Sequence, residues 1–203
     1  MQEHIRKYFI MGSQDCDRVP EVILEEAIAA GITAFQFREK GVGSLSGDAK
    51  ISLGKKLRKI CRDHDVPFFV NDEVELVEIL EADGIHVGQD DADVEELRRK
   101  FSDIFIGLSI SNEEELEKSP VHLVDYVGAG PVFSTSSKAD AKKPVGVEWI
   151  QSLRAKHSEL PIVGIGGIDE TNAHEVIQAG ADGVAIISAI TKSDDIEKTV
   201  KKL

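Results

Sequence analysis

The chain has 203 residues, of which 41% are hydrophobic, and this suffices for one sizeable buried core. A formal net charge of −13 with no basic block disfavours a nucleic-acid partner, and the lack of any run of about 18 apolar residues disfavours a membrane span. The first residues carry no signal-peptide core, and Cys16 and Cys61 show neither metal-ligand spacing nor a disulfide framework. We therefore expect a cytoplasmic protein.

Short apolar runs alternate with segments of helical period along the whole chain. The expected strands are 8–12, 34–38, 67–70, 85–87, 104–109, 126–128 and the apolar runs within 161–168 and 181–190. The expected helices are 19–30, 46–64, 74–80, 93–100, 113–118 and 149–157, a segment between the last two strands, and a final helix from about 193. This alternation predicts one α/β domain over residues 1–203, a single (β/α)8 TIM barrel. An open doubly wound sheet is the alternative, because periodicity does not show closure.

Polar residues follow these strands at their C-terminal ends, the face on which barrel enzymes carry their sites. One polar residue after a strand is usually a helix cap, but several on one face favour a function. They include Gln36 to Lys40, Asn71, Asp72, Gln89 to Asp91, Ser109, Thr135 to Lys138, Gly167 and Ser188. We expect these residues to converge on one site, to which the long loop 130–146 contributes.

The last two strands end in residues that suit an anion. Gly166 and Gly167 follow one strand, and Ile187 and Ser188 follow the next. The loops after the seventh and eighth strands of (β/α)8 barrels bind phosphate, and glycine N–H groups approach an anion with no Cβ in the way. The same glycines could merely shape a tight turn, so a phosphate site remains a hypothesis here.

A protein of this negative charge needs local cations to bind phosphates. Arg38 and Lys40 in one loop and Lys138 in another supply them. Lys40 could instead form a Schiff base, as lysines do in barrel aldolases, but its place beside Arg38 favours a phosphate ligand.

Carboxylates on adjacent strands suggest a metal. Asp72 and Asp91 could share a Mg²⁺, which prefers one or two carboxylates with waters and substrate phosphates, and Asp90 is the rival ligand. A diphosphate bound there beside a separate monophosphate would make the protein a transferase. The sequence shows no obvious catalytic triad or zinc cluster, and we expect His86 to be a hydrogen-bonded interior histidine.

Several of these segments together resemble the thiamine phosphate synthase family, over nearly the whole chain. They are Gln36-Phe37-Arg38-Glu39-Lys40, Val70-Asn71-Asp72, Gly84-Ile85-His86-Val87-Gly88-Gln89, Gly130-Pro131-Val132-Phe133, Gly164-Ile165-Gly166-Gly167-Ile168 and Ile187-Ser188-Ala189-Ile190. Each segment is a weak signal alone, but their order and spacing are specific. The resemblance implies a Mg²⁺-dependent (β/α)8 barrel that joins 4-amino-5-hydroxymethyl-2-methylpyrimidine diphosphate to 4-methyl-5-(2-hydroxyethyl)thiazole phosphate, giving thiamine phosphate and pyrophosphate.

The resemblance also implies roles for individual residues, matched by position. The pyrimidine diphosphate would be held by Gln36, Phe37, Arg38, Glu39, Lys40, Asn71, Ser109 and Lys138, among which Arg38, Lys40, Ser109 and Lys138 would be catalytic. The thiazole phosphate would be held by Thr135, Ser136, Ser137, Gly167, Ile187 and Ser188. Asp72 and Asp91 would bind Mg²⁺.

The sequence departs from the family pattern at a few positions. Ser134 stands where proline is common, Ser137 where threonine is common, and residues 110–112 replace a pattern of small residues and histidine. The alternatives are a thiazole tautomerase-like paralogue, which needs neither metal nor diphosphate ligands, and a non-catalytic phosphate-binding barrel. The expected partners are two phosphorylated small molecules, and a homo-oligomer is compatible with apolar residues on the outer helices.

Overall fold

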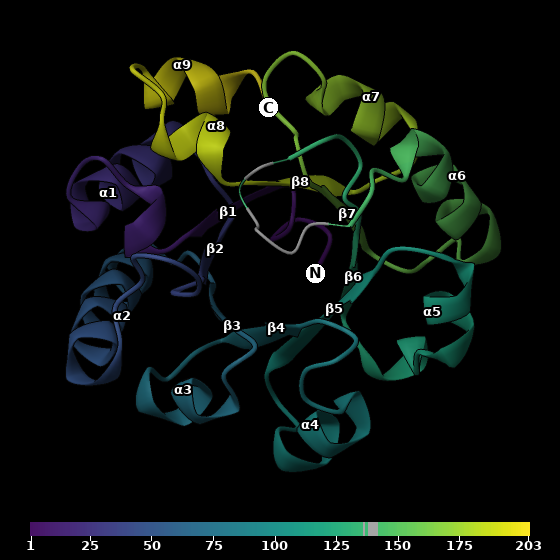
Figure 1. Ribbon diagram of the computed structural model, residues 1–203, viewed down its shortest axis with the longest axis horizontal. Coiled ribbons are helices and arrows are strands. Elements are labelled where there is room, and N and C mark those ends of the chain that lie inside the picture. The colour runs from purple at the N-terminus through teal and green to yellow at the C-terminus, as the bar shows by residue number, and fades with distance from the viewer. Residues whose placement is uncertain (136, 138–141) are drawn as a thin grey trace.

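The computed structural model describes residues 1–135, 137 and 142–203. Its parallel strands form one closed barrel in which neighbours in space are also neighbours in the chain (Figure 1). Pairing of the first strand with the last, Lys7 opposite Val184, closes the ring. The strands are β1 (Lys7–Met11), β2 (Ala34–Phe37), β3 (Phe68–Asn71), β4 (Gly84–Val87), β5 (Phe105–Ile110), β6 (Tyr126–Ala129), β7 (Ile162–Ile165) and β8 (Gly183–Ile186). The predicted barrel is confirmed, and the open sheet is excluded.

Helices surround this ring of strands (Figure 1). They are α1 (Pro20–Ala30), α2 (Gly47–Asp63), α3 (Val74–Ile79), α4 (Val94–Lys100), α5 (Glu113–Lys118), α6 (Gly146–Lys156), α7 (Ala173–Gln178), α8 (Ser188–Thr191) and α9 (Ile196–Lys201). Short 3-10 turns occupy Ser13–Asp15 and Val121–Leu123. None of the helices in the described ranges is long and apolar enough to cross a membrane.

Three helices differ from the sequence-based expectation. The segment after β8, where no helix was predicted, forms α8, and the final helix begins at Ile196 rather than near 193. A single helical turn is too short to show a hydrophobic period, which explains the missed element. Helix α6 begins at Gly146, earlier than predicted, and Trp149 lies in its first turns, where its indole N–H donates to the Ile110 carbonyl at 3.0 Å. Trp149 thus packs between α6 and the barrel strands.

Buried apolar residues form two layers. The larger layer lies between the strands and the helices and includes Phe35, Ile85 and Val127. The smaller layer includes Tyr8 and Phe69 inside the barrel and extends to Ile5 in the N-terminal segment. Because successive side chains of a strand point to opposite faces, most strands contribute apolar side chains to both layers, which explains the unbroken apolar runs in the sequence.

Glycines make room for the large rings inside the barrel. A Cβ on Gly107 would lie 2.2 Å from the Tyr126 ring and 2.5 Å from Nδ1 of His86, and a Cβ on Gly84 would lie 2.4 Å from the Phe69 ring. Such contacts are far below van der Waals separation, so any side chain at these two positions would displace a ring. The interior is therefore filled by pairing small residues on one strand with aromatic residues on the next.

A recurring hydrogen bond joins the strands in pairs at the N-terminal end of the barrel. The residue just before each even-numbered strand accepts from an N–H at the start of the preceding odd-numbered strand. The pairs are Lys7 N to Thr33 Oγ1 at 2.9 Å, and Phe68 N to Asp83 Oδ2, Ile106 N to Asp125 Oδ2 and Ile162 N to Asp182 Oδ2, each at 2.8 Å. The side chain thus satisfies a backbone donor that the ladder leaves open.

Three of these acceptors are aspartates that also bind an arginine. Arg58 of α2, Arg98 of α4 and Arg154 of α6 contact Asp83, Asp125 and Asp182 at 2.9, 2.6 and 2.6 Å. Each arginine also donates to nearby backbone carbonyls, among them the Gly180 carbonyl for Arg154. One aspartate therefore couples a helix to two strands, far from the C-terminal face.

We predict that Asp182→Ala lowers the free energy of unfolding by about 2–3 kcal/mol, because it removes the carboxylate that both the Ile162 N–H and the Arg154 guanidinium contact. Urea unfolding followed by circular dichroism would measure the change. Glu197→Ala is the matched control, since it breaks a solvent-exposed ion pair with Lys201 and should leave the midpoint essentially unchanged. We call an aspartate such as Asp182, with its arginine and its strand N–H, a clamp. Equal urea midpoints for the two variants would contradict the stabilising role of the Asp182 clamp.

Candidate functional site

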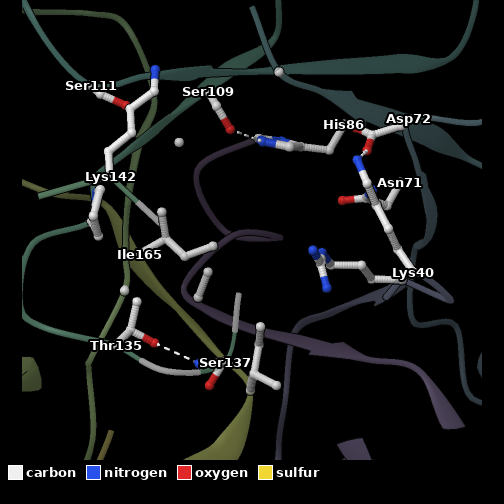
Figure 2. A pocket seen from close by; sticks show the side chains of 18 of the residues that line it. Lys40, Asn71, Asp72, His86, Ser109, Ser111, Thr135, Ser137, Lys142 and Ile165 are labelled. Carbon is white, nitrogen blue, oxygen red and sulfur yellow. Dashed lines mark hydrogen bonds and ion pairs between the residues drawn. The ribbon is translucent and has the colours of Figure 1, made fainter. Parts of the chain in front are cut away.

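A cavity of about 400 Å³ opens at the C-terminal ends of the strands (Figure 2). Polar residues from β2 to β5 and their loops form one wall, and the loops after β6, β7 and β8 form the other. The lining residues include Arg38, Lys40, Asn71, Asp72, His86, Gln89, Asp90, Asp91, Ser109, Ser111, Thr135, Ser137, Lys142, Ile165, Gly166, Gly167, Ile187 and Ser188. The predicted convergence on one face therefore occurs.

Arg38 is the main buried charge of this cavity. Its residue is only 6% exposed, yet it lines the cavity, and its guanidinium makes no hydrogen bond or ion pair with any other described residue. A buried cation without a protein partner is costly unless a ligand supplies the counter-charge. The planar guanidinium matches the oxygens of a phosphate group. Arg38 is thus suited to hold an anionic ligand.

Lys40 and two aspartates form a charged cluster at the rim. The Lys40 ammonium lies 2.6 Å from Asp72 Oδ2, and this hydrogen bond raises the pKa of Lys40. Burial raises the pKa of the Asp91 carboxyl, and the Asp72 carboxylate raises it further, whereas the Gly88 N–H and Lys40 lower it. The backbone of Asp72 has a φ of +60°, a left-handed conformation that aspartate tolerates better than most residues. Two carboxylates that repel each other are thereby held side by side.

This donor set suits a divalent cation of the magnesium type. Among the described residues, no group of three or more His, Cys, Asp or Glu side chains could hold a metal ion alone. Magnesium commonly takes only one or two carboxylates and completes its shell with water and substrate phosphate. The mutual repulsion of Asp72 and Asp91 would be relieved by such an ion, so the residues present fit it.

A second wall carries hydroxyl groups and glycines. Ser137 Oγ lies 3.3 Å from Ser188 Oγ, and the Ser137 N–H donates to Thr135 Oγ1 at 3.2 Å. Gly167 has a φ of +65°, and its N–H has no acceptor in the part of the chain that the structure describes. A Cβ at Gly167 would lie 2.4 Å from the Ser134 carbonyl oxygen, so close packing alone already requires glycine. Neutral donors around an open amide can surround a phosphate.

Comparisons with known proteins agree with this site. The sequence pattern of the family described as thiamine monophosphate synthase matches residues 7–190. The chain is 59% identical over 199 residues to the thiamine-phosphate synthase of Oceanobacillus iheyensis, covering 98% of this chain and 97% of the relative. It is 51% identical over 203 residues to that of Staphylococcus saprophyticus, covering 99% and 96%.

The chain belongs to the thiamine monophosphate synthase family. It is therefore a transferase of thiamine biosynthesis. The solved structure of a thiamine phosphate pyrophosphorylase from Pyrococcus furiosus superposes with a TM-score of 0.86 at 30% identity, over 100% of this chain and 95% of that one. The resemblance seen in the sequence is confirmed.

The structure places most of the predicted site residues of this synthase family member in the cavity. They are Arg38, Lys40, Asn71, Asp72, Asp91, Ser109, Thr135, Ser137, Gly167, Ile187 and Ser188. Ser136 and Lys138 lie outside the described residues. Their roles, and those of the lining residues as ligands, stay predictions.

Three predicted residues do not line the cavity. Phe37 packs in the layer between barrel and helices, and Gln36 is buried and donates to the Tyr8 hydroxyl. The Glu39 carboxylate accepts from Ser13 and from the Leu45 N–H, so it ties two loops together. Alternation along the strand turns Phe37 and Glu39 away from the ligand side. Gln36 is on the same face as Arg38, but its side chain lies deeper in the barrel, against Tyr8.

Other lining residues escaped the sequence reading. His86 was expected inside the barrel and is buried and hydrogen-bonded, but it also faces the cavity. Lys142 lines the cavity and pairs with Glu115 of α5 at 2.6 Å. Ile165 ends β7 in register with inward-facing Ala185. Counting alternate positions along β7 from the glycine turn could have identified Ile165, whereas a lysine within a long loop carries no periodic signal.

We predict opposite pKa changes at Asp91 for two variants of the cluster. Lys40→Met should raise the pKa of Asp91 further, because it removes a cation that lowers it, and Asp72→Asn should lower that pKa, because it removes a repelling carboxylate. Carbon-detected NMR titration of the Asp91 carboxyl in Mg²⁺-free buffer would measure both. Shifts of the same sign in the two variants would contradict the described cluster.

Proposed function

We propose that the chain joins 4-amino-5-hydroxymethyl-2-methylpyrimidine diphosphate to 4-methyl-5-(2-hydroxyethyl)thiazole phosphate, with release of pyrophosphate. The observation that carries this proposal is the buried Arg38 beside the Asp72–Asp91 pair, with no hydrogen bond or ion pair from its guanidinium to any described residue. A separate wall of hydroxyl groups and the Gly167 amide lies opposite. The first wall suits a diphosphate with its metal, and the second suits a monophosphate. A two-phosphate donor and a one-phosphate acceptor match the reaction of the family.

Asp72 and Asp91 would hold Mg²⁺, and the bound ion would help to neutralise the charge that develops on the departing pyrophosphate. The protein's own cations act on the same charge. Arg38 would bind the diphosphate oxygens through its planar donors, while Lys40 and Lys138 would add positive charge around them. Asn71 of β3 and Ser109 of β5, on either side of β4, would orient the pyrimidine end.

The chemistry needs no protein nucleophile. The bond between the pyrimidine methylene carbon and the diphosphate oxygen breaks with its electron pair leaving on pyrophosphate, and the lone pair of the thiazole nitrogen then forms the new carbon–nitrogen bond. No proton has to be transferred in these two steps. The residues Thr135, Ser136, Ser137, Gly167, Ile187 and Ser188 would hold the thiazole phosphate, so that its nitrogen faces the reacting carbon.

The setting of the reaction is part of the proposal. We infer that both substrates are phosphorylated small molecules and that the protein acts in the cytoplasm. The two cysteines support a reducing compartment, since Cys16 and Cys61 are both free thiols. Because the net charge of −13 repels anions at a distance, attraction of the substrates must come from the local cations of the cavity.

We predict equal release of thiamine phosphate and pyrophosphate when the purified protein receives both substrates and Mg²⁺. The products would be quantified together by chromatography and a coupled phosphate assay, with EDTA in a parallel reaction. EDTA should suppress both products equally, because the metal acts on the departing pyrophosphate. A folded protein that binds the thiazole phosphate without forming product would contradict the proposal and favour a tautomerase-like or purely phosphate-binding role.

We predict that Asp91→Ala abolishes Mg²⁺-dependent turnover, a loss of about 100-fold or more, as expected when one electrostatic partner of the transition state is removed. Binding of the thiazole phosphate, measured by calorimetry, should be nearly unchanged, because that ligand occupies the opposite wall. Asp90→Ala is the matched control, since Asp90 is the neighbouring carboxylate on the same loop and should retain activity. The reverse pattern would reassign the metal ligand to Asp90.

A further inference from the structure

A chain of hydrogen bonds runs from the closed interior of the barrel to the cavity wall. Gln36 Nε2 donates to the Tyr8 hydroxyl at 3.0 Å, and the Tyr8 and Tyr126 hydroxyls lie 2.9 Å apart. The Tyr126 hydroxyl lies 3.0 Å from His86 Nδ1, and His86 Nε2 lies 2.9 Å from Ser109 Oγ. Figure 2 shows the last contact, with Ser109 and His86 side by side at the cavity.

The order of donors along this chain follows from its buried end. Because Gln36 donates to Tyr8, the Tyr8 oxygen acts as an acceptor and its own hydrogen needs a partner. Both phenols are fully buried, and among the described residues the Tyr126 hydroxyl is the other partner of Tyr8. An unsatisfied buried O–H is costly, so Tyr8 donates to Tyr126, and Tyr126 in turn donates to Nδ1 of His86.

Both phenols keep their hydrogens. Burial raises the pKa of Tyr8 above its ordinary value, and burial together with the neighbouring Tyr8 raises the pKa of Tyr126 well above it. Each tyrosine is therefore a neutral group with one hydrogen to donate, and a charged phenolate does not interrupt the chain.

We propose that Tyr126, supported by Tyr8 and Gln36, is a positioning residue that holds His86 in its Nε2–H tautomer and so makes Ser109 a hydrogen-bond donor toward the substrate. With Nδ1 occupied as an acceptor, the neutral imidazole carries its hydrogen on Nε2 and donates it to Ser109 Oγ. The serine hydroxyl then turns its own hydrogen to the cavity. The substrate group that it meets is an acceptor, such as a ring nitrogen or a phosphoryl oxygen.

This inference rests on the proposed function for its kinetic consequence, but its structural part does not. The reversed chain is the clear competitor. If the Gln36 amide presented its oxygen to Tyr8, every donor would reverse, His86 would carry its hydrogen on Nδ1, and Ser109 would donate to His86 instead of the substrate. The two arrangements differ in one observable, the protonated nitrogen of His86.

The first test measures the tautomer in the unsubstituted protein, and a substitution serves only to assign the signals. Long-range proton–nitrogen NMR of ligand-free protein labelled with ¹⁵N-histidine distinguishes the two ring nitrogens, and the His86 signals are assigned by their loss in His86→Asn. We expect a pyrrole-like nitrogen at Nε2 and a pyridine-like nitrogen at Nδ1. A pyrrole-like Nδ1, or a doubly protonated ring at pH 8, would overturn the proposal whether or not the protein forms thiamine phosphate.

The second test is a double-mutant cycle in the synthase reaction. Tyr126→Phe should lower kcat about tenfold, as loss of one hydrogen bond of about 1.4 kcal/mol would, with little change in the KM for thiazole phosphate. In a Ser109→Ala background the same substitution should cost almost nothing, because Ser109 carries the effect. An equal loss in both backgrounds would show a general packing role and overturn the proposal.

A packing control separates the hydrogen bond from the ring. Phe69 packs edge-on against Tyr126 with ring centroids 5.9 Å apart. Its side chain has no polar atom and so takes no part in the chain of hydrogen bonds. Phe69→Leu should therefore lower the melting temperature without moving the hydrogen from Nε2 of His86, whereas Tyr126→Phe should produce a mixture of tautomers. A mixture in Phe69→Leu as well would contradict the assignment of the effect to the Tyr126 hydroxyl.

Discussion

The buried charge of Arg38 is the main constraint at the C-terminal end of the barrel, where the cavity lies. A protein of net charge −13 repels anions at long range, so the proposed recognition of phosphates would depend on a few cations placed where water is scarce. Lys40 is paired with Asp72, and Lys142 with Glu115, whereas the Arg38 guanidinium forms no hydrogen bond or ion pair with a described residue. Binding of an anionic ligand would remove the cost of this buried cation, which couples affinity directly to the fold.

The barrel interior changes character along its axis. Near the N-terminal end it is filled by apolar and aromatic side chains, and toward the cavity the same inward positions carry Gln36, His86 and Ser109. Gly107 is the point at which the two regions meet, since its missing side chain admits both the Tyr126 ring and the His86 ring. The same residues therefore determine the packing of the interior and the order of its hydrogen bonds. A larger residue at 107 would displace both rings.

The strand and helix order and the position of the site could be predicted from the sequence. Strands buried on both faces appear as unbroken apolar runs, and the polar residues that follow them must meet at one edge of the sheet. Periodicity could not reveal barrel closure, the single turn of α8, or which neighbours on a strand face the cavity. The sequence predicted that Phe37 and Glu39 bind the ligand together with Arg38. In the structure, alternation along the strand turns the Phe37 side chain toward the helices, and the Glu39 carboxylate accepts from the Ser13 N–H. The position of Lys142 at the cavity was not predicted, because a lysine within a long loop carries no periodic signal.

The clamps at the N-terminal end divide the barrel into four pairs of strands. Each pair carries its own side-chain link, through Thr33, Asp83, Asp125 or Asp182, and the three aspartate links also include the helix that precedes the pair. A chain break in the turn between β4 and α4 would leave every one of these links within a single fragment. The N-terminal end of the barrel, opposite the cavity, thus consists of separately linked strand pairs. Two half-barrels would each retain the side-chain contacts that join their own pairs.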